Sequence, residues 1–316
     1  YVKALDAEGQ STRFPPFLDP LDSAEYLGSV VHDPTIETNL PLYQWFSENP
    51  DALKTDNGGR GSLFYEGELY DNIFMNLHGQ STKGMPKKSY NIDFNSDHRF
   101  AWGPGLERMK DINVLTTYAD KARVRNTMGY EVFHDAGHAS HLARSVRVHQ
   151  NGAYIGLYDA VEDPDDTWLE RVGLDGGGAL YKMYNTLNNA NGGEKKTRKD
   201  EGKEDLQTFI AGLNTQGEAL EAYVFDHVSI PGMINYLAAT IATGGRDCGH
   251  KNYYAYRDTL GTGEWWFLPW DMDLTFGHTW TPQHQYFDDW MYFDHDLYIC
   301  NNNNLISKLY AMPVVW

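Results

Sequence analysis

Four side chains with oxygen donors near residue 250 have the types and spacing that phosphoryl transfer needs. Asp247 and Asn252 form the pattern D-x-x-x-x-N, and Asp271 and Asp273 follow a stretch of aromatic residues further along. Magnesium takes hard oxygen ligands and keeps several waters, so one or two carboxylates with an amide oxygen suffice to hold it. A separate carboxylate must then orient an acceptor hydroxyl and accept its proton. These residues predict a metal–phosphate site.

The order of these residues along the chain matches that of protein kinases. Those enzymes have a catalytic-loop Asp, an Asn five residues later, a hairpin, and a metal-binding Asp beside Phe-Gly. Here Phe276-Gly277 follows Asp273, and residues 252–257 and 264–268 predict the hairpin. Each motif alone is weak, because D-x-x-x-x-N is common and Asp271 and Asp273 also suit a turn. Their joint order around a hairpin is what favours the metal site.

The elements that must position these residues follow an α+β pattern. Strands are predicted at residues 62–66, 69–78, 89–95, 143–148 and 154–161, the last two joined by the turn Asn151-Gly152. Helices are predicted at residues 120–137, 205–213, 218–227 and 231–243, with a final one after 301–304. Asp120 is expected to cap the first helix and Gly137 to end it. The polar run 185–205 predicts a mobile surface loop.

This order of elements predicts a two-lobed α+β protein with an atypical protein-kinase-like fold. The expected regions are an irregular lead-in over residues 1–60, a strand-rich N-lobe with one helix over 61–165, and a mainly helical C-lobe over 166–316. Because the chain stops just after the final helix with no polar tail, we expect the natural protein to continue beyond residue 316.

Composition excludes several classes of protein. The chain has 316 residues, 41% of them hydrophobic, and a net charge of −18 from 44 acidic and 26 basic residues. Such a charge repels nucleic acid and anionic lipid, so neither is an expected partner. No apolar run approaches the roughly 20 residues of a membrane span. Cys248 and Cys300 allow one disulfide, and the sequence leaves open whether they pair.

The chain resembles the CotH kinase family, the spore-coat CotH-like atypical secreted protein kinases, from about residue 63 onward. Residues 78–82 are similar to the family's R-G-N-S-S, and residues 86–90 to its P-K-K-S-Y. Residues 125–126 are similar to its Arg-Asn pair, and residues 156–162 to its stretch from G-x-Y to Glu. Residues 252–254 are similar to its N-Y-Y, and residues 270–277 to its W-D-x-D-x-x-x-G. P-K-K-S-Y and the last stretch are the most specific. The resemblance implies a kinase-like fold, ATP with Mg²⁺ or Mn²⁺ as cofactors, and phosphate transfer to Ser/Thr hydroxyls of a protein substrate outside the cytoplasm, either secreted or at the cell surface.

The resemblance also implies roles for the residues of the first motif. Asp247 matches the family's catalytic carboxylate, and Asn252 and Asp271 match its metal ligands. Asp273 is either a second metal ligand or a residue that supports Asp271.

Lys87 or Lys88 matches the phosphate-contacting lysine of the third strand. By strand alternation Lys88 shares a face with Tyr90, while Lys87 faces the other way. The sequence does not decide which of them reaches phosphate, and a solvated lysine at a strand end is the alternative for either.

Three further residues are candidates for the nucleotide site. Glu131 lies where kinases place the Glu that pairs with the lysine, although a helical Glu is more often simply exposed. Arg125 belongs to the Arg-Asn pair and contacts phosphate or holds a carboxylate; a structural salt bridge is an equal alternative. Glu162 lies where a kinase hinge borders adenine, or it begins the acidic turn E-D-P-D-D.

The loop at residues 78–82 departs from the family pattern. Its sequence is H-G-Q-S-T, so His78 stands where the family has Arg. Gly79, Ser81 and Thr82 remain, and their backbone N–H groups and hydroxyls could still cradle phosphate. A neutral His supplies less charge than Arg, so a weaker phosphate affinity is expected.

The segment 278–296 mixes His, Asp and aromatic residues. It fits no closed set of metal ligands and predicts an activation-segment-like surface or acceptor groove, with a plain packed loop as the alternative.

Three functions remain from these observations. The first is an ATP- and Mg²⁺-dependent protein kinase. The second is a catalytically weak or inactive pseudokinase of the same fold that acts in surface assembly or binding, an alternative that His78 favours. The third is a metal-dependent hydrolase built on Asp271, Asp273 and the histidines.

Overall fold

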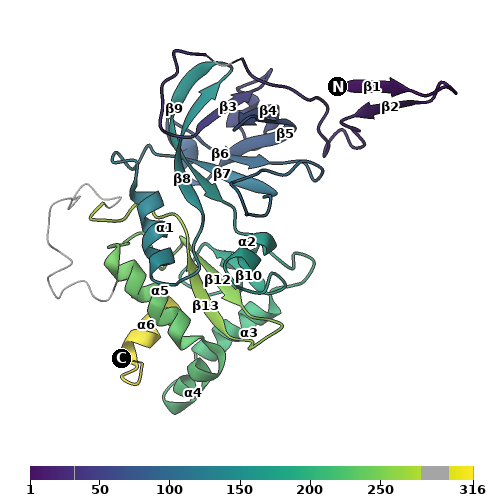
Figure 1. Cartoon of the computed structure of the whole chain (residues 1–316). Coiled ribbons are helices and arrows are strands. Elements are labelled where there is room, and N and C mark those ends of the chain that lie inside the picture. The colour runs from purple at the N-terminus through teal and green to yellow at the C-terminus, as the bar shows by residue number, and fades with distance from the viewer. Residues whose placement is uncertain (32, 279–298, 316) are drawn as a thin grey trace. The chain divides into compact units, whose positions relative to one another are not determined.

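The computed structural model describes residues 1–31, 33–278 and 299–315. The chain divides into two compact units, Tyr1–Arg123 with Leu142–Asp163 and Val124–His141 with Pro164–Trp316 (Figure 1). The predicted α+β class is confirmed. The unit boundaries differ from the predicted regions, because helix α1 (Arg125–Asp135) groups with the second unit instead of the strand-rich one.

The first unit contains a closed barrel with the strand order β3-β4-β5-β6-β7-β9-β8. Its strands are β3 (Leu42–Phe46), β4 (Gly59–Tyr65), β5 (Glu68–His78), β6 (Ser89–Asp93), β7 (Asp111–Thr116), β8 (Ala143–Gln150) and β9 (Ala153–Glu162). Strands β3 and β8 pair in parallel and close the cylinder, while the other neighbours are antiparallel. Short 3₁₀ turns, η1 (Ala52–Lys54) and η2 (Ser81–Gly84), interrupt the connections.

Side-chain alternation explains how the barrel forms around its core. In β6 the side chains of Tyr90 and Ile92 are buried among the barrel's aromatic residues, while Asn91 and Asp93 are only half-buried. This is the period of two that an amphipathic strand requires. The hairpin between β8 and β9 is confirmed: its turn residues Asn151-Gly152 have φ of +49° and +82°, the left-handed values that favour Asn-Gly.

The lead-in, predicted to be irregular over residues 1–60, contains strands. Strands β1 (Val2–Leu5) and β2 (Ser11–Phe14) form a separate hairpin, and β3 belongs to the barrel. The carboxylate of Asp71 on β5 holds part of the lead-in, because its Oδ2 accepts the N–H groups of Glu25 and Tyr26 at 3.1 and 2.8 Å. This long-range attachment has no local sequence pattern.

The second unit is built on a sheet with the order β11-β10-β12-β13 and on helices. Its strands are β10 (Ala179–Met183), β11 (Gly193–Lys195), β12 (Tyr253–Arg257) and β13 (Trp265–Pro269). Its helices are α1, α2 (Asp166–Arg171), α3 (Glu204–Leu213), α4 (Glu218–His227), α5 (Ile230–Ala242) and α6 (Asn304–Ala311), with the 3₁₀ turn η3 (Ala190–Gly192). The predicted helices α3, α4, α5 and α6 and the hairpin β12–β13 are confirmed. Among the described residues, no helix has the length and apolarity that crossing a membrane requires.

Strand β13 lies at the edge of this sheet, and its outward carbonyls are bound by groups from other elements. The donors are Ser229 N to Trp265 O at 3.0 Å, His138 Nε2 to Phe267 O at 2.9 Å, and His141 Nε2 to Pro269 O at 3.0 Å. Both histidines are buried. Because buried backbone carbonyls need partners, these side chains stabilise the strand that leads to Asp271.

Helix α1 begins later than predicted. Asp120 does not cap it: its Oδ1 accepts the N–H of Ala122 at 2.9 Å, and the helix starts at Arg125. Arg123 has φ of +60°, a left-handed conformation that an α-helix cannot contain. The end of the helix is confirmed, since Gly137 has φ of +72° and donates its N–H to His134 O.

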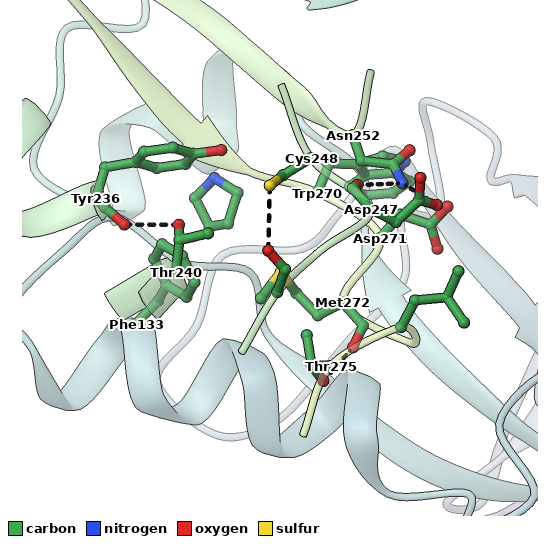
Figure 2. A pocket seen from close by; sticks show the side chains of 13 residues that line it. Phe133, Tyr236, Thr240, Asp247, Cys248, Asn252, Trp270, Asp271, Met272 and Thr275 are labelled. Carbon is green, nitrogen blue, oxygen red and sulfur yellow. Dashed lines mark hydrogen bonds between the residues drawn. The ribbon is translucent and has the colours of Figure 1, made fainter. Parts of the chain in front are cut away.

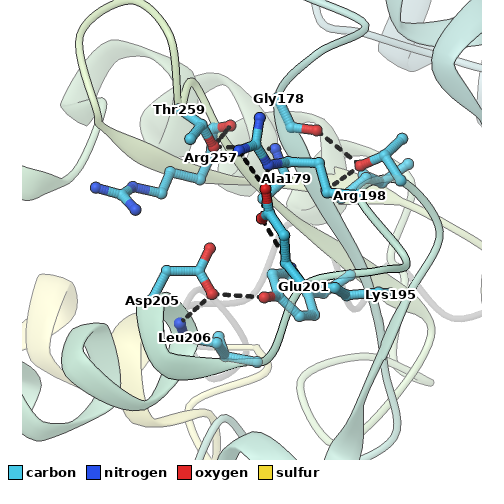
Figure 3. Close-up of polar contacts among 12 residues, drawn as sticks. Gly178, Ala179, Lys195, Arg198, Glu201, Asp205, Leu206, Arg257 and Thr259 are labelled. Carbon is cyan, nitrogen blue, oxygen red and sulfur yellow. Dashed lines mark hydrogen bonds and ion pairs between the residues drawn. The ribbon is translucent and has the colours of Figure 1, made fainter.

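The polar run 185–205, predicted to be a mobile loop, is instead fastened by long-range pairing and ion pairs. It contains η3 and β11, and β11 pairs with β10. Glu201 binds Arg198 through two hydrogen bonds of 2.8 and 2.5 Å and Lys195 at 3.3 Å (Figure 3). The hydroxyl of Tyr181 donates to Asp205 at 2.5 Å. These contacts join residues whose local sequence carries no strand or helix pattern.

Candidate functional site

The β12–β13 hairpin brings the predicted oxygen donors together. Asn252 directly precedes β12 and Asp271 follows β13, and the two strands pair antiparallel with Tyr253 opposite Pro269. Neighbouring strands are only about 5 Å apart, so the two side chains are placed at the same end of the ribbon. With Asp247 they line a small pocket of the second unit, where Figure 2 shows the three side by side. The hairpin therefore juxtaposes these residues.

Asn252 and Asp247 are directly bonded. The side-chain amide Nδ2 of Asn252 donates to the backbone carbonyl and to Oδ2 of Asp247 at 3.0 and 2.9 Å. The Asp247 carboxylate, whose side chain is 9% exposed, also lies 3.4 Å from His250 Nε2 and 3.7 Å from Lys251 Nζ. The D-x-x-x-x-N spacing therefore forms a closed turn that fixes the carboxylate.

The backbone at the two predicted metal-ligand positions is left-handed. Asn252 has φ of +61° and Asp271 has φ of +60°. For a residue other than glycine this conformation costs about 1–2 kcal/mol and persists only where surrounding contacts enforce it. Both residues stand at ends of the ribbon, where the chain must turn to aim an oxygen-bearing side chain into the pocket.

Helix α1 supplies contacts that hold the turn after β13. The N–H of Asp271 donates to Tyr130 Oη at 3.0 Å, and the N–H of Met272 donates to Asn126 Oδ1 at 2.9 Å. A Cβ on Gly129 would lie 2.7 Å from Met272 Cβ, so a glycine is needed where the helix and the turn approach. Sequence reasoning noted Asn126 only as part of the Arg-Asn pair and missed Tyr130. The spacing N-x-x-G-Y on one helix face was the available signal.

The electrostatics of the pocket are set by two acidic side chains, Asp247 and Asp271. Burial of Asp271 raises the pKa of its carboxyl, and the nearby Asp247 carboxylate raises it further. Lys182, Lys251 and a hydrogen bond with Asp273 act in the opposite direction. Two carboxylates in one buried pocket repel each other unless a positive group compensates them. The donor set of carboxylates and an amide thus fits a hard divalent cation such as Mg²⁺.

Lys182 is a site residue that sequence reasoning missed. It lies on β10 and its Nζ is 4.8 Å from the ring centroid of Trp270, the residue before Asp271. Its charge lowers the pKa of Asp271. The available signal was a lysine inside the otherwise apolar strand sequence A-L-Y-K-M.

The pairing that the sequence left open is settled by a disulfide between Cys248 and Cys300, with a Cα–Cα distance of 5.4 Å. Cys248 directly follows Asp247. Beside the disulfide, Asn303 Nδ2 donates to Gly249 O at 2.9 Å. The residues before α6 are therefore fastened to the turn that carries Asp247.

The first unit holds the predicted lysines, and Lys87 is bound within it. Its Nζ donates to Thr117 Oγ1 at 2.9 Å and to Leu157 O, and lies 4.0 Å from the Tyr158 ring centroid. Gly156 leaves the space, because a Cβ there would be 3.1 Å from Lys87 Cε. Burial lowers the pKa of Lys87 to about 8.

Lys88 has a different environment. Its Nζ donates to the backbone carbonyl of Lys83 at 2.5 Å and so closes the preceding loop. Strand alternation predicted that Lys87 faces away from the side of Tyr90. This prediction does not hold, because β6 begins only at Ser89 and Lys87 packs over the core residue Tyr158. Which lysine contacts phosphate stays a prediction.

The loop after β5 is a compact turn. Gly79 has φ of +90°, and a Cβ on it would meet Thr82 Oγ1 at 2.2 Å. Thr82 Oγ1 donates to His78 O at 3.2 Å, and Ser81, the first residue of η2, is exposed. The predicted phosphate cradle therefore has a defined backbone, while its contact with phosphate stays a prediction.

The remaining candidates lie in both units. In the first, Glu162 is 3% exposed and its Oε2 accepts the N–H of Leu142 at 3.0 Å. In the second, Arg125 is the half-buried first residue of α1, and Glu131 is exposed on the same helix. The roles proposed for these three in nucleotide binding stay predictions. The predicted acceptor groove at 278–296 lies, except for His278, outside the described residues.

Comparison with known proteins gives two findings. A family model described as CotH kinase protein matches residues 75–315. The inner spore coat protein H of Bacillus subtilis (strain 168) is 27% identical over 261 residues, which cover 76% of this chain and 70% of that protein. Both matched regions are long enough to include more than an isolated motif.

Proposed function

Because the chain belongs to the CotH kinase family, we propose that it is an ATP- and Mg²⁺-dependent protein kinase that phosphorylates Ser/Thr hydroxyls of a protein acceptor. The observation that carries the proposal is the convergence of Asp247, Asn252 and Asp271 at one end of the β12–β13 ribbon. Phosphoryl transfer needs positioning and charge neutralisation more than covalent chemistry. The three side chains would supply the positioning, and a cation held by them would supply the neutralisation.

Asn252 and Asp271 would hold the metal. The Asn252 amide donates through Nδ2 to Asp247, which leaves Oδ1 as the atom we assign to the cation. Asp271 provides a carboxylate whose pKa is raised by burial and by the nearby Asp247, and a bound cation would stabilise its charged form. Asp273 acts as a second ligand or supports Asp271. A bound Mg²⁺ supplies charge neutralisation for the phosphates of ATP.

Asp247 would act on the acceptor. Its carboxylate is fixed by Asn252 and flanked by His250 and Lys251, so it can orient a hydroxyl group and accept its proton. Its position beside the metal ligands is the arrangement that transfer to a hydroxyl requires.

Cationic side chains would bind the phosphates. We assign this role to Lys87, with the backbone of Gly79, Ser81 and Thr82 as further donors. With a pKa of about 8, Lys87 is mostly protonated at neutral pH, and an anionic ligand stabilises that form further. Lys182, near Asp271, is a second cation for this purpose.

The proposed location is outside the cytoplasm. The Cys248–Cys300 disulfide is typical of oxidising compartments. The relative from Bacillus subtilis is named as an inner spore coat protein. Both observations support the proposal.

Transfer of labelled phosphate tests the proposed activity. The purified chain is incubated with γ-labelled ATP, Mg²⁺ or Mn²⁺, and an acceptor protein. Asp271→Asn is expected to lose transfer, because it removes a metal-binding charge. Asp226→Asn, an exposed change on α4, is the matched control and should label like the wild type. Equal labelling by Asp271→Asn would overturn the proposal.

The alternative is a CotH-like pseudokinase that binds partners without transferring phosphate. His78, in place of the Arg in the family's loop, favours it. Thermal unfolding with ATP and Mg²⁺ distinguishes the two together with the transfer assay. Stabilisation without transfer would indicate a nucleotide-binding pseudokinase, and no stabilisation by any nucleotide would indicate a scaffold. Saturating ligand, at about 100 times its Kd, adds roughly 2.7 kcal/mol of stability.

A further inference from the structure

We infer that Asn126 and Tyr130 are positioning residues that fix the backbone of Asp271 for metal binding. The inference rests on the proposed function, since it concerns the same metal site. Tyr130 Oη accepts the N–H of Asp271 at 3.0 Å, and Asn126 Oδ1 accepts the N–H of the next residue, Met272, at 2.9 Å. Asn126 and Tyr130 are each 1% exposed. Two consecutive backbone donors are therefore bound by two buried side chains of one helix.

The two acceptors lie on one face of α1. Residues four apart on a helix are neighbours, so Asn126 and Tyr130 project in the same direction. Gly129 lies on this face as well, and its missing side chain lets the helix approach Met272. In the motif N-x-x-G-Y, the Asn and the Tyr thus accept hydrogen bonds from the turn after β13. The Gly leaves the space that this turn needs beside the helix.

Tyr130 is itself held in place. Its ring packs edge-on against the buried His141 with centroids 5.0 Å apart, and its backbone carbonyl accepts the Ser140 hydroxyl at 2.6 Å. His141 in turn stacks on Trp168 and binds Pro269 O. The phenol oxygen is therefore a fixed point to which the Asp271 backbone is attached.

The conformation of Asp271 explains why such a fixed point matters. Its φ of +60° is unfavourable for a residue with a side chain and persists only when contacts impose it. Without an acceptor for its N–H, the turn can relax to extended backbone and carry the carboxylate away. Mg²⁺ demands near-ideal octahedral geometry, so a small displacement of a ligand weakens binding. Asn126 and Tyr130 act through Asp271, and neither is assigned contact with the metal.

The test is Tyr130→Phe, which removes the acceptor oxygen and keeps the ring. Tyr256→Phe is the matched control, because that buried hydroxyl in the same unit donates to Asp175 O at 3.0 Å, outside the pocket. We expect the Mn²⁺ concentration for half-maximal transfer to rise about fivefold in Tyr130→Phe, as the loss of one neutral hydrogen bond implies. The control should keep the wild-type value. Asn126→Leu is a second variant with the same expected direction.

A second readout does not depend on activity. Amide hydrogen exchange at Asp271 should be faster in Tyr130→Phe than in the wild type and in Tyr256→Phe. Unchanged exchange, or wild-type Mn²⁺ dependence in both Tyr130→Phe and Asn126→Leu, would overturn the positioning role while the proposed function stands. A wild type that binds neither Mn²⁺ nor ATP would overturn the proposed function, and the exchange result would still decide whether Tyr130 fixes the turn.

Discussion

The side-chain amide of Asn252 is bound to Asp247 at two points, the backbone carbonyl and the carboxylate Oδ2. One residue therefore links the proposed metal ligand set to the proposed catalytic carboxylate. A change at Asn252 should disturb both the cation and the acceptor hydroxyl, whereas a change at a single ligand should disturb the cation first.

Asn252→Gly tests this link without disturbing the backbone. Glycine adopts φ near +61° at no steric cost, so the free energy of unfolding should fall only by the loss of the amide hydrogen bonds to Asp247, about 1–3 kcal/mol. Loss of the amide should lower phosphate transfer by about 100-fold, as for other groups that orient a reacting centre. Steady-state transfer and urea unfolding measure the two quantities. Transfer near the wild-type rate would show that the amide has no part in the reaction.

The stability of the second unit should fall in mild acid because of His138. Burial lowers the pKa of His138 to about 4, below the unfolded value of about 6.5. The unfolded state therefore binds a proton first as pH falls, and stability is lost between about pH 6.5 and 4. The loss should reach about 3 kcal/mol. Urea unfolding at pH 7, 5.5 and 4 measures it, and His138→Gln, which does not titrate, should show a flatter dependence.

Reduction of the Cys248–Cys300 disulfide should destabilise the second unit by about 4 kcal/mol, because the bond joins residues 52 positions apart and so closes a long loop of the chain. Urea unfolding with and without a phosphine reductant measures the change. The double variant Cys248→Ala with Cys300→Ala serves as the control and should not respond to the reductant. If the reductant shifts wild type and double variant alike, the effect does not come from this bond.

Lys87 should react with acylating reagents faster than ordinary lysines. At pH 8 about half of its amine is neutral, given a pKa of about 8, against less than about 1% for an unperturbed lysine. Peptide mapping after brief acetylation measures the modification, with Lys88 as the internal comparison. If Lys87 contacts phosphate, ATP with Mg²⁺ should slow its modification. If ATP with Mg²⁺ protects Lys88 and leaves Lys87 reactive, Lys88 is the lysine that contacts phosphate.

The sequence predicted the elements whose patterns are local. Alternation indicated β6, Asn151-Gly152 indicated the β8–β9 hairpin, and the helices α3, α4 and α5 were predicted close to their observed bounds. Sequence prediction failed where contacts between residues far apart in the chain determine the structure. The run 185–205 is fastened by Arg198, Glu201 and β10, and the start of α1 is displaced by the left-handed Arg123, neither of which has a local signature.

The site residues also divide into those that local patterns predict and those that depend on tertiary packing. Asp247, Asn252 and Asp271 could be predicted because one hairpin joins them and their order along the chain is specific. Tyr130 and Lys182 were missed although each carries a local signal, because their proximity to Asp271 comes from the tertiary packing of α1 and β10. The packing of Lys87 also required the structure, since it depends on the space that Gly156 leaves beside a core tyrosine.

The closure of the barrel by β3 and β8 has a consequence for dissecting the protein into fragments. A fragment limited to residues 75–315, the region that the family model matches, would lack β3, β4 and part of β5. The cylinder would then open, leaving β8 and the rest of β5 with unpaired backbone groups that can recruit strands from other molecules. Such a fragment should aggregate even though it retains every residue of the metal pocket.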